Sequence, residues 1–495
     1  MQDQNYIAVD LGAESGRVML GTVSRAGIAL AEIHRFPNGP VQVGAALYWD
    51  ILRLWGEIQI GIAKAIAHAK SNGQAVSGIG VDTWGVDFGL LDQHGELLAN
   101  PVHYRDTRTH GMPDKLFSRM PREKTYAITG IQTMNFNTLF QLCALAENRP
   151  QVLENARHLL YIPDLLAFWL CNRMANEYTI ASTSQMLDAR RRHYSNDILA
   201  NIPLRPELLP EIVMPGTVLG HVTGQAAAGT QARGIPVLAV GAHDTASAVA
   251  AVPAHADDWL FLSSGTWSLL GAELDQPVLS PDAMKFNLTN EGGVGGKIRL
   301  LKNISGLWLL QECRRAWSRE GKEFDYSTLV QLAREEAAHS ALLDLADPQM
   351  LAPGDMPEKI IAQCRRSGQR VPETPGQFTR VILESLAATY ASVRNMIEHV
   401  TGRKFTHLHI VGGGSQNDLL NQMAADATGL QVLAGPVEAT ALGNVMVQAM
   451  ATGQLDSLAA GRKLVGKSAM VRDFIPHETE KWTQWIAHVL PTAHI

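Results

Sequence analysis

The stretch YIAVDLGAESGRVMLGTV, residues 6–23, contains two apolar runs separated by a short turn of small and polar residues. Apolar runs bounded by such turns predict β-strands, here over residues 6–10 and 16–23. A third strand is expected over 27–36. The chain therefore opens as an antiparallel meander rather than as a strand followed at once by a helix.

A helix and a fourth strand are expected after the meander. Asp50 is a suitable capping residue, and apolar side chains then recur at helical spacing as far as Ser71. Asn72-Gly73 is a typical helix stop. A strand is expected over 78–84. Meander, crossover helix and fourth strand together predict an α/β fold.

The second half of the chain repeats this style. A division near residue 246 gives two halves of similar size, so we expect one domain over 1–246 and another over 247–495. The elements expected in the second half are a strand pair over 257–274, a glycine-rich segment and strand over 292–303, a helix over 383–400, and a strand, glycine loop and helix over 407–429, with Ser415 as the helix cap and Gly429 as its stop.

Composition limits the classes of protein to consider. The chain has 495 residues, of which 46% are hydrophobic and 18% charged, so it can bury a large globular core. A net charge of −6 without a basic stripe argues against a nucleic-acid binder. The start of the chain lacks the pattern of a signal peptide, and no apolar segment has membrane-spanning length, which predicts a cytoplasmic protein. The four cysteines form no close pair, as expected in a reducing compartment, and give no metal-site spacing.

The turn of the opening meander, VDLGAESGR (9–17), has the composition of a phosphate-binding loop. Its glycines let backbone N–H groups face a ligand, Ser15 adds a hydroxyl, and Arg17 adds a positive charge. Asp10, at the end of the first strand, is placed to hold Mg²⁺ directly or through water. A hairpin turn with a surface arginine explains this stretch equally well. A second loop of the same kind in LSSGTWSLLG (262–271) favours a nucleotide held between two domains.

Two further glycine-containing stretches differ in how well their sequence context supports a role in phosphate binding. IVGGGSQN (410–417) places three glycines before a helix, which permits close approach of a phosphate or a flat ligand, without the spacing of the dinucleotide fingerprint. GRKLVGKS (461–468) matches the P-loop pattern, with Lys467 as its lysine, but no strand is expected before it and no long helix after it. We therefore interpret 461–468 as a basic, solvated loop and keep a P-loop NTPase as an alternative.

The stretch GAHDTASAV (241–249) places His243 and Asp244 among small residues, directly after a short apolar run. One interpretation is structural, with Asp244 capping the helix that follows. The other is catalytic, because a phosphoryl transferase needs a carboxylate within reach of the acceptor hydroxyl, and small neighbours leave room for a substrate. The phosphate-loop candidates elsewhere in the chain favour the catalytic interpretation.

Taken together, these stretches resemble the FGGY family of carbohydrate kinases, and within it the branch that acts on L-rhamnulose. The resemblance implies two ribonuclease-H-like domains of the actin and hexokinase type, closing over a cleft, and transfer of phosphate from MgATP to the 1-hydroxyl of L-rhamnulose. It runs nearly end to end and is carried by residues 8–17, GVDTWGVDFGLLD (80–92), YRDTRT (104–109), FNTLFQL (136–142), HDTASAV (243–249), LSSGTWSL (262–269), LKNISGLWLLQ (301–311) and HIVGGGSQNDLLNQ (409–422).

The resemblance also implies roles for individual residues. Asp244 would be the general base on the sugar hydroxyl, with Mg²⁺ as cofactor and Asp10 as its ligand. The partners would be a ketose and ATP, for a monomer or a homodimer that binds neither nucleic acid nor membrane. ATP would contact Ala13, Glu14, Ser15, Gly16, Arg17, Thr266, Gln311 and Gly413, and the sugar would contact Gly85, His243, Asp244, Thr245 and Asn303.

Several positions leave alternatives open. Glu14 is acidic where this branch carries a small polar residue, so we expect its side chain to point to solvent or to Mg²⁺. Asp106 and Arg108 match a D-x-R element of the family and equally fit a surface ion pair. Trp84 either packs in the core or contacts the methyl group of the sugar. Kinases for L-fuculose, L-xylulose or L-ribulose are alternatives within the family, and a non-transferring ATPase of the actin or Hsp70 type, or a sugar-sensing binding protein, is the alternative outside it.

Overall fold

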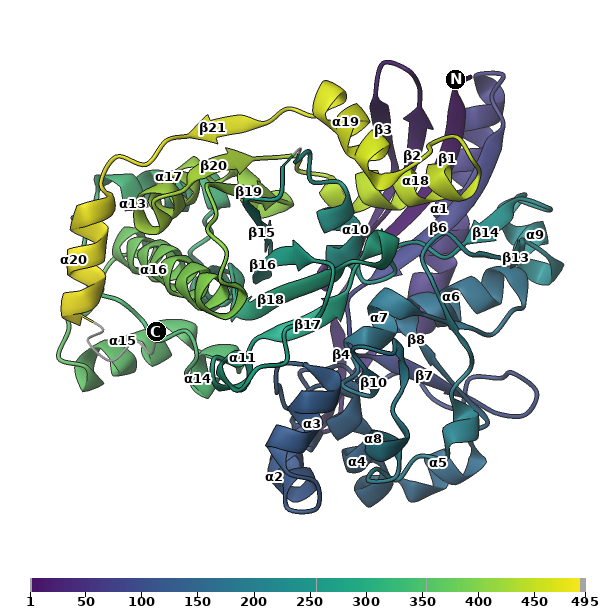
Figure 1. Ribbon diagram of the computed structural model, residues 1–495, viewed down its shortest axis with the longest axis horizontal. Coiled ribbons are helices and arrows are strands. Elements are labelled where there is room, and N and C mark those ends of the chain that lie inside the picture. The colour runs from purple at the N-terminus through teal and green to yellow at the C-terminus, as the bar shows by residue number, and fades with distance from the viewer. Residues whose placement is uncertain (1, 255, 353, 490–495) are drawn as a thin grey trace. The chain divides into compact units, whose positions relative to one another are not determined.

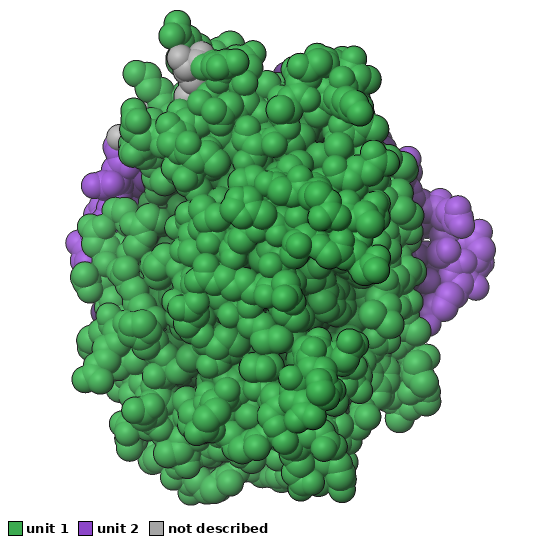
Figure 2. Space-filling model, turned by 90° about the vertical axis from the view of Figure 1, so that its right-hand side faces the viewer, with its two compact units in different colours: residues 1–255, 273–300, 439–469 green, residues 256–272, 301–438, 470–495 purple. Residues whose placement is uncertain are grey.

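The computed structural model describes residues 2–254, 256–352 and 354–489 (Figure 1). The chain forms two compact units, each made of segments that are not contiguous in the sequence. The chain returns to unit 1 twice after residue 255, so the two units do not correspond to a single division of the chain at residue 246. The domains expected over 1–246 and 247–495 stay a prediction. Unit 1 contains residues 1–255, 273–300 and 439–469, and unit 2 contains residues 256–272, 301–438 and 470–495 (green and purple in Figure 2).

Unit 1 is built on a six-stranded sheet in the order β13-β14-β6-β1-β2-β3. The predicted meander is confirmed: β1 (Gln4–Leu11), β2 (Ser15–Val23) and β3 (Ile28–Pro37) pair antiparallel. The predicted fourth strand is β6 (Val76–Thr83), which pairs parallel with β1 and with β14 (Pro236–Leu238). The carboxyl ends of β1, β6 and β14 therefore meet at one edge of the sheet.

Two helices pack on this sheet, and glycines set how closely they approach. Helix α1 (Ile51–Ser71) is the predicted one, with the Asp50 carboxylate accepting from the backbone N–H of Arg53. Helix α18 (Ala439–Ala451) packs against β1, β2 and β6. A Cβ added to Gly80 of β6 would lie 2.6 Å from the Asn444 Oδ1 of this helix. Only glycine therefore allows α18 to lie this close to the strand ends that carry the site.

Unit 1 also contains the elements given below, of which β13 is an edge strand of this sheet and the others lie outside it (Figure 1). One of them, α10, starts at the carboxyl edge of the sheet and is central to the site. They are β4 (Pro40–Val43), β5 (Ala46–Trp49), β7 (Phe88–Leu91), α2 (Met112–Phe117), α3 (Arg122–Thr129), α4 (Thr138–Asn148), α5 (Pro150–Asn155), β8 (His158–Tyr161), α6 (Ile162–Cys171), β9 (Asn176–Glu177), α7 (Tyr178–Ser182), β10 (Leu187–Asp188), β11 (His193–Tyr194), α8 (Asn196–Leu199), β12 (Ile212–Val213), β13 (Val218–His221), α9 (Gly224–Thr230), α10 (Asp244–Ala250), α11 (Pro281–Lys285), β17 (Thr289–Gly292) and α19 (Leu458–Ser468).

Unit 2 repeats the pattern of antiparallel strands followed by parallel ones. The predicted strand pair is confirmed as β15 (Trp259–Ser264) and β16 (Trp267–Leu274), and β15 pairs parallel with β19 (His407–Val411). The boundary between the units falls within β16 and within β18 (Ile298–Ser305). The other elements of this unit are α12 (Trp308–Arg319), α13 (Tyr326–Glu335), α14 (Pro348–Leu351), α15 (Met356–Arg366), α16 (Pro375–Thr401), α17 (Asp418–Thr428), β20 (Gln431–Ala434), β21 (Arg472–Phe474) and α20 (Thr479–Val489).

Helix ends in unit 2 correct two details of the sequence analysis. The helix expected over 383–400 is α16, which begins earlier because Thr374 caps it and a proline occupies its first turn. The cap of α17 is Asn417, whose side chain accepts from the Leu420 N–H, so the prediction of Ser415 was wrong. Ser415 lies in a preceding turn and donates to the Gly412 carbonyl at 2.7 Å instead.

Residues 461–468 form the greater part of helix α19 rather than a loop. Both interpretations of GRKLVGKS, the P-loop and the solvated loop, are therefore wrong. A Cβ on Gly461 would meet the Met446 sulfur at 2.2 Å, so this glycine lets α19 lie against α18. Arg462 forms a bidentate pair with Glu273, with both N–O distances 2.9 Å. In the part of the chain that the structure describes, no helix is both long and apolar enough to span a bilayer.

Candidate active site

The carboxyl edge of the unit 1 sheet gathers three aspartates. Asp10 of β1 lies opposite Asp82 of β6 in the parallel register. Next to Asp82, the backbone N–H of Thr83 donates to the Ala242 carbonyl at 2.9 Å, which places the start of α10 beside β6. Asp244 is the first residue of that helix. The charges of Asp10 and Asp244 both contribute to raising the pKa of Asp82, although burial is the larger cause.

Asp244 combines a fixed orientation with access for a substrate. Its Oδ1 accepts from the Thr245 N–H at 2.5 Å and from the Thr245 hydroxyl at 3.1 Å, and 29% of its side chain is exposed. The cap position is His243, so Asp244 does not take the structural role of a helix cap. Burial raises the pKa of Asp244, assisted by Asp10 and opposed by His243 and Thr245. A carboxylate with a raised pKa accepts a proton more readily than an ordinary aspartate.

Asp82 was not singled out from the sequence. It is fully buried and accepts a hydrogen bond from the Asn444 amide of α18 at 2.5 Å. Its Oδ1 has no hydrogen-bond partner among the described residues. The motif containing Asp82 was visible, but its position beside Asp10 follows only from the parallel pairing of β1 with β6.

The first phosphate-loop candidate is the turn between β1 and β2, with Leu11 opposite Gly16, as the hairpin interpretation requires. Arg17 is not a surface residue, because it pairs with the buried Asp10 at 2.5 Å. A Cβ on Gly16 would lie 2.2 Å from the Phe36 ring, so packing already explains that glycine. The turn residues Ala13, Glu14 and Ser15 are half-buried, and the Glu14 carbonyl accepts from the Asn38 N–H at 2.9 Å.

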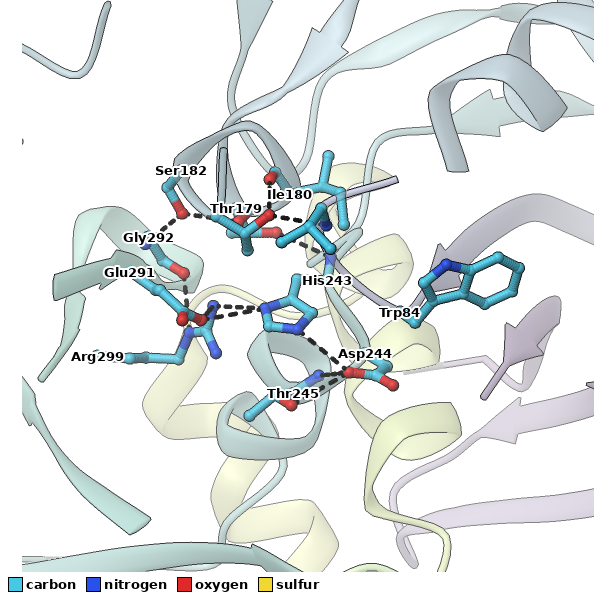
Figure 3. A network of polar contacts seen from close by, with 12 residues as sticks. Trp84, Thr179, Ile180, Ser182, His243, Asp244, Thr245, Glu291, Gly292 and Arg299 are labelled. Carbon is cyan, nitrogen blue, oxygen red and sulfur yellow. Dashed lines mark hydrogen bonds and ion pairs between the residues drawn. The ribbon is translucent and has the colours of Figure 1, made fainter. Parts of the chain in front are cut away.

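The residues expected to contact the sugar form a group around His243. A Cβ on Gly85 would lie 3.4 Å from the His243 Nε2, so glycine leaves space next to that nitrogen. His243 Nε2 is 3.5 Å from the Asp244 Oδ1, and Thr245 is buried directly beyond (Figure 3). Unit 1 thus brings Gly85, His243, Asp244 and Thr245 together, as predicted for one binding site.

The aromatic residue beside this group belongs to the core. Trp84 is 5% exposed, and its ring stacks on Trp49 with 3.9 Å between centroids. Both indole N–H groups donate to the Asp87 carboxylate, at 2.6 Å from Trp49 and 3.1 Å from Trp84. Burial raises the pKa of Asp87 to about 6, against these hydrogen bonds. Core packing is therefore the role that the structure gives Trp84.

The D-x-R element is not a surface ion pair, so that interpretation was wrong. Asp106 is 7% exposed, and its carboxylate accepts from the backbone N–H groups of Leu47 and Arg108 at 2.8 and 2.9 Å. The Arg108 guanidinium donates to Gln141 Oε1 at 2.8 Å, and burial lowers its pKa. These two residues fix the chain between β5 and α4.

A second buried carboxylate holds the backbone that enters the site. Glu177 Oε2 accepts from the N–H groups of Thr179 at 2.8 Å, Ile180 at 3.1 Å and Ala242 at 3.2 Å. The Thr179 hydroxyl accepts in turn from the His243 N–H at 3.2 Å. Burial raises the pKa of Glu177 to about 7 despite these donors.

The predicted nucleotide residues of unit 2 lie around the β15–β16 turn. The side-chain amide of Gln311 of α12 donates to the Thr266 hydroxyl at 3.3 Å, and the backbone N–H of Trp308 donates to the Thr266 carbonyl at 3.1 Å. A Cβ on Gly414 would lie 2.0 Å from the Ser264 hydroxyl, whereas one on Gly413 would meet nothing within 4 Å. The third glycine of this loop therefore packs against β15, and Gly413 faces open space. Asn303 lies half-buried on β18.

Sheets of this topology in both units, with a carboxylate at a helix start on a sheet edge, agree with the fold and site expected of a sugar-kinase type of phosphotransferase. The chain belongs to the FGGY family of carbohydrate kinases. The family's N-terminal domain matches residues 5–251, and its C-terminal domain matches residues 260–452.

Relatives and solved structures agree with this assignment. The chain is 45% identical over 485 residues to a rhamnulokinase of Bacteroides thetaiotaomicron, covering 98% of both chains. It is 39% identical over 479 residues to a rhamnulokinase of Halalkalibacterium halodurans, covering 96% of this chain and 100% of the relative. A ligand-bound xylulose kinase of Lactobacillus acidophilus superposes with a TM-score of 0.78 at 15% identity, covering 99% of both chains. A glycerol kinase of Plasmodium falciparum with ADP gives 0.78 at 15% identity, covering 99% of this chain and 98% of that one. These similarities confirm the predicted α/β fold of the actin and hexokinase type.

Proposed function

We propose that this protein transfers phosphate from ATP to the 1-hydroxyl of L-rhamnulose and acts in L-rhamnose breakdown in the cytoplasm. The assignment of L-rhamnulose as the substrate is supported by the 38–45% identity to rhamnulokinases over at least 94% of the chain. The solved xylulose and glycerol kinases support only the fold, because their identity to this chain is far lower.

The proposed general base is Asp244. As the O1–Pγ bond forms and the bond from Pγ to the β–γ bridging oxygen breaks, the O1 proton passes to the Asp244 carboxylate and ADP leaves. The exposure and the raised pKa of Asp244 support this role. Because phosphoryl transfer has a loose transition state, orienting the hydroxyl matters at least as much as basicity. The fixed hydrogen bonds from Thr245 supply that orientation.

The other site residues divide between nucleotide and sugar. For ATP we propose the turn residues Ala13, Glu14, Ser15, Gly16 and Arg17 of unit 1, and Thr266, Gln311 and Gly413 of unit 2. For the sugar we propose Gly85, His243, Asp244 and Thr245 of unit 1 and Asn303 of unit 2. The open space beside Gly413 supports its assignment to a ligand. At Gly85, a Cβ would lie 3.3 Å from the Thr183 hydroxyl and 3.4 Å from the His243 Nε2, so glycine keeps a side chain from crowding that nitrogen.

Asp10 is the proposed Mg²⁺ ligand. Carboxylate oxygens are the donors that Mg²⁺ prefers, and the buried Asp82 oxygen without a hydrogen-bond partner faces the same edge of the sheet. Among the described residues no group of three or more His, Cys, Asp or Glu side chains is placed to hold a metal ion. Asp10 and the neighbouring Asp82 would offer carboxylate oxygens to such an ion, whose remaining ligands would come from elsewhere. When bound, Mg²⁺ neutralises charge on the transferring phosphate.

The test is release of ADP from MgATP with a panel of ketoses: L-rhamnulose, L-fuculose, L-xylulose and L-ribulose. We expect the highest kcat/KM with L-rhamnulose. A pocket that recognises one methyl or hydroxyl group separates such sugars by about 1–3 kcal/mol, or roughly 10- to 200-fold. A higher kcat/KM with another ketose would show that this ketose, rather than L-rhamnulose, is the substrate, and would leave the proposed mechanism unchanged. ATP binding without turnover of any of these sugars would contradict the proposed transfer.

A further inference from the structure

His243 is held on the side away from Asp244 by two buried charged side chains. Its Nδ1 lies 3.1 Å from Nη2 of Arg299 and 3.2 Å from Oε2 of Glu291 (Figure 3). The Arg299 side chain is fully buried and that of Glu291 is 5% exposed. The two charges pair with each other at 3.2 Å. All three residues belong to unit 1.

The arginine itself is rigidly fixed. Its Nε donates to the Gly292 carbonyl at 2.8 Å, and the Gly292 N–H donates to the Ser182 hydroxyl at 2.8 Å. A Cβ on Gly292 would lie 2.5 Å from the Tyr178 ring, so the strand can approach α7 this closely only with glycine. The Arg299 guanidinium is therefore anchored to Gly292 of β17, which a hydrogen bond and a close contact fix against α7.

The chemistry of these neighbours selects one form of the histidine ring. A guanidinium group only donates hydrogen bonds, so a bond from Arg299 requires a lone pair on Nδ1 and places the ring proton on Nε2. Nε2 faces the Asp244 carboxylate at 3.5 Å, where a proton is attracted and a lone pair is repelled. The opposite form would have Nδ1–H donate to Glu291, but the charge of Glu291 is already balanced by Arg299. The hydrogen bond from Arg299 thus favours a lone pair on Nδ1, and the Asp244 carboxylate favours a proton on Nε2.

We propose that Arg299, charge-balanced by Glu291, is a positioning residue that holds the His243 ring with a lone pair on Nδ1 and its proton on Nε2. This inference rests on the proposed sugar kinase function and deepens it. His243 then donates a hydrogen bond to the sugar oxygen beside the reacting hydroxyl, and Asp244 alone receives the proton of that hydroxyl. A Cβ on Gly85 would lie 3.4 Å from Nε2, so glycine at this position keeps a side chain away from that nitrogen.

The direct test is ¹⁵N NMR of the ring nitrogens of the full chain, labelled at histidine, without substrate. The signals of His243 among the 17 histidines are assigned by their loss in His243→Gln. We expect Nδ1 to show the shift of an unprotonated nitrogen and Nε2 that of a protonated one at neutral pH. A proton on Nδ1, or on both nitrogens, would overturn the inference whatever the activity of the enzyme.

The second test changes the arginine. Arg299→Met combined with Glu291→Met removes the charges as a pair, since removal of one partner alone would leave a buried charge uncompensated. We expect a rise of roughly 10- to 100-fold in the KM for L-rhamnulose, with the KM for ATP unchanged and a mixture of His243 ring forms. Arg299→Lys, which keeps a donor and the charge, should restore part of the sugar affinity. An unchanged sugar KM and ring form in the folded double variant would contradict the proposal.

A matched control separates positioning from stability. Arg462→Met with Glu273→Met removes another buried arginine pair of unit 1 that does not contact His243. This control should leave both the His243 ring form and the sugar KM as in the wild type. If no ketose is phosphorylated, the NMR test still decides the ring form, so failure of the proposed function and failure of this inference are distinguishable.

Discussion

Helix α10 has an arginine–carboxylate pair near each of its ends, and the two pairs serve different purposes. At its start, Arg17 pairs with Asp10, whose charge also acts on Asp244. At its end, Arg462 pairs with Glu273 and also donates to the carbonyls of Val249 and Ala250. All four charged side chains are largely buried, at 18% and 4% exposure for the first pair and 11% and 8% for the second.

The difference lies in what surrounds each pair. Arg462 donates to the Glu273 carboxylate and to the carbonyls of Val249 and Ala250 at the end of α10, where helix carbonyls lack intrahelical partners. Arg17 instead stands among three aspartates, where its positive charge lowers the pKa of Asp82 against a strong effect of burial. The stretches 461–468 and 12–17 both contain glycine, serine and a basic residue. The first lies in helix α19, whose Arg462 binds the end of α10, and the second forms the β1–β2 turn with its candidate phosphate site.

The largest effect on activity is expected at the start of α10. Asp244→Asn keeps the size of the side chain but removes the proton acceptor. We expect kcat to fall by about 10³-fold or more, since general-base catalysis contributes roughly 10²- to 10⁴-fold and orientation is lost as well. ATP binding, measured by calorimetry, should survive. Turnover near the wild-type rate would show that Asp244 is not the base.

The largest effect on stability is expected at the other end of α10. Arg462→Met leaves Glu273 buried and unpaired, which costs about 3–5 kcal/mol of unfolding free energy. The folded fraction should keep its kcat, because Glu273 and the carbonyls of Val249 and Ala250, to which Arg462 donates, are not candidate site residues. Urea unfolding and a specific-activity assay on the same sample check both statements. Addition of Glu273→Met should recover much of the stability, and a loss of kcat in the folded protein would give Arg462 a catalytic role.

The start of α10 also depends on Glu177, which makes stability sensitive to pH. The pKa of Glu177 is raised by burial to about 7, so between the ordinary value of 4.5 and 7 the unfolded state ionises while the folded state stays protonated. Its contribution is fully present below about pH 4.5 and is lost as the pH rises to 7, by about 3 kcal/mol. Glu177→Gln should therefore lose stability relative to the wild type mainly at low pH. Urea unfolding at pH 5 and pH 7.5 checks this, and an equal difference at both would contradict the raised pKa.

The direct counterpart of Arg462 is Arg17. Arg17→Gln should raise the KM for ATP by roughly 10- to 100-fold, because one charge-assisted contact to phosphate is lost. Arg17→Gln also leaves the buried Asp10 without its arginine, but Arg462→Met in addition removes the bonds to the Val249 and Ala250 carbonyls, so the loss of stability should be smaller in Arg17→Gln. Steady-state kinetics with varied ATP, next to the unfolding curve, compare the two arginines. A large loss of stability with unchanged ATP kinetics would make both pairs structural.

Local sequence signals accounted for much of the fold. The meander, the Asp50 cap of α1 and the stop at Gly429 could be predicted because caps, stops and strand turns depend on neighbouring residues. The cap of α17 was misplaced at Ser415 because Asn417, two residues later, is an equally good capping residue.

The site was predictable only in part. The group of Gly85, His243, Asp244 and Thr245 was found because two short motifs contain it. Asp82, Glu291 and Arg299 were missed, since their importance depends on strand register and on the return of the chain to unit 1 after residue 272. Helix α19 was missed because GRKLVGKS contains two glycines, and its helical state depends on packing against α18.

The smallest effect is expected at the residue that the P-loop pattern singles out. Lys467 is exposed in the last turn of α19, where a positive charge interacts favourably with the helix dipole. Lys467→Ala should therefore cost at most about 1 kcal/mol and leave kcat and the KM for ATP unchanged. Lys463→Ala, another exposed lysine of the same helix, is the matched control. A selective loss of ATP turnover in Lys467→Ala, absent from Lys463→Ala, would mean that α19 rearranges into a phosphate loop. Such a rearrangement would separate Gly461 from Met446 and break the hydrogen bonds of Arg462 to the end of α10.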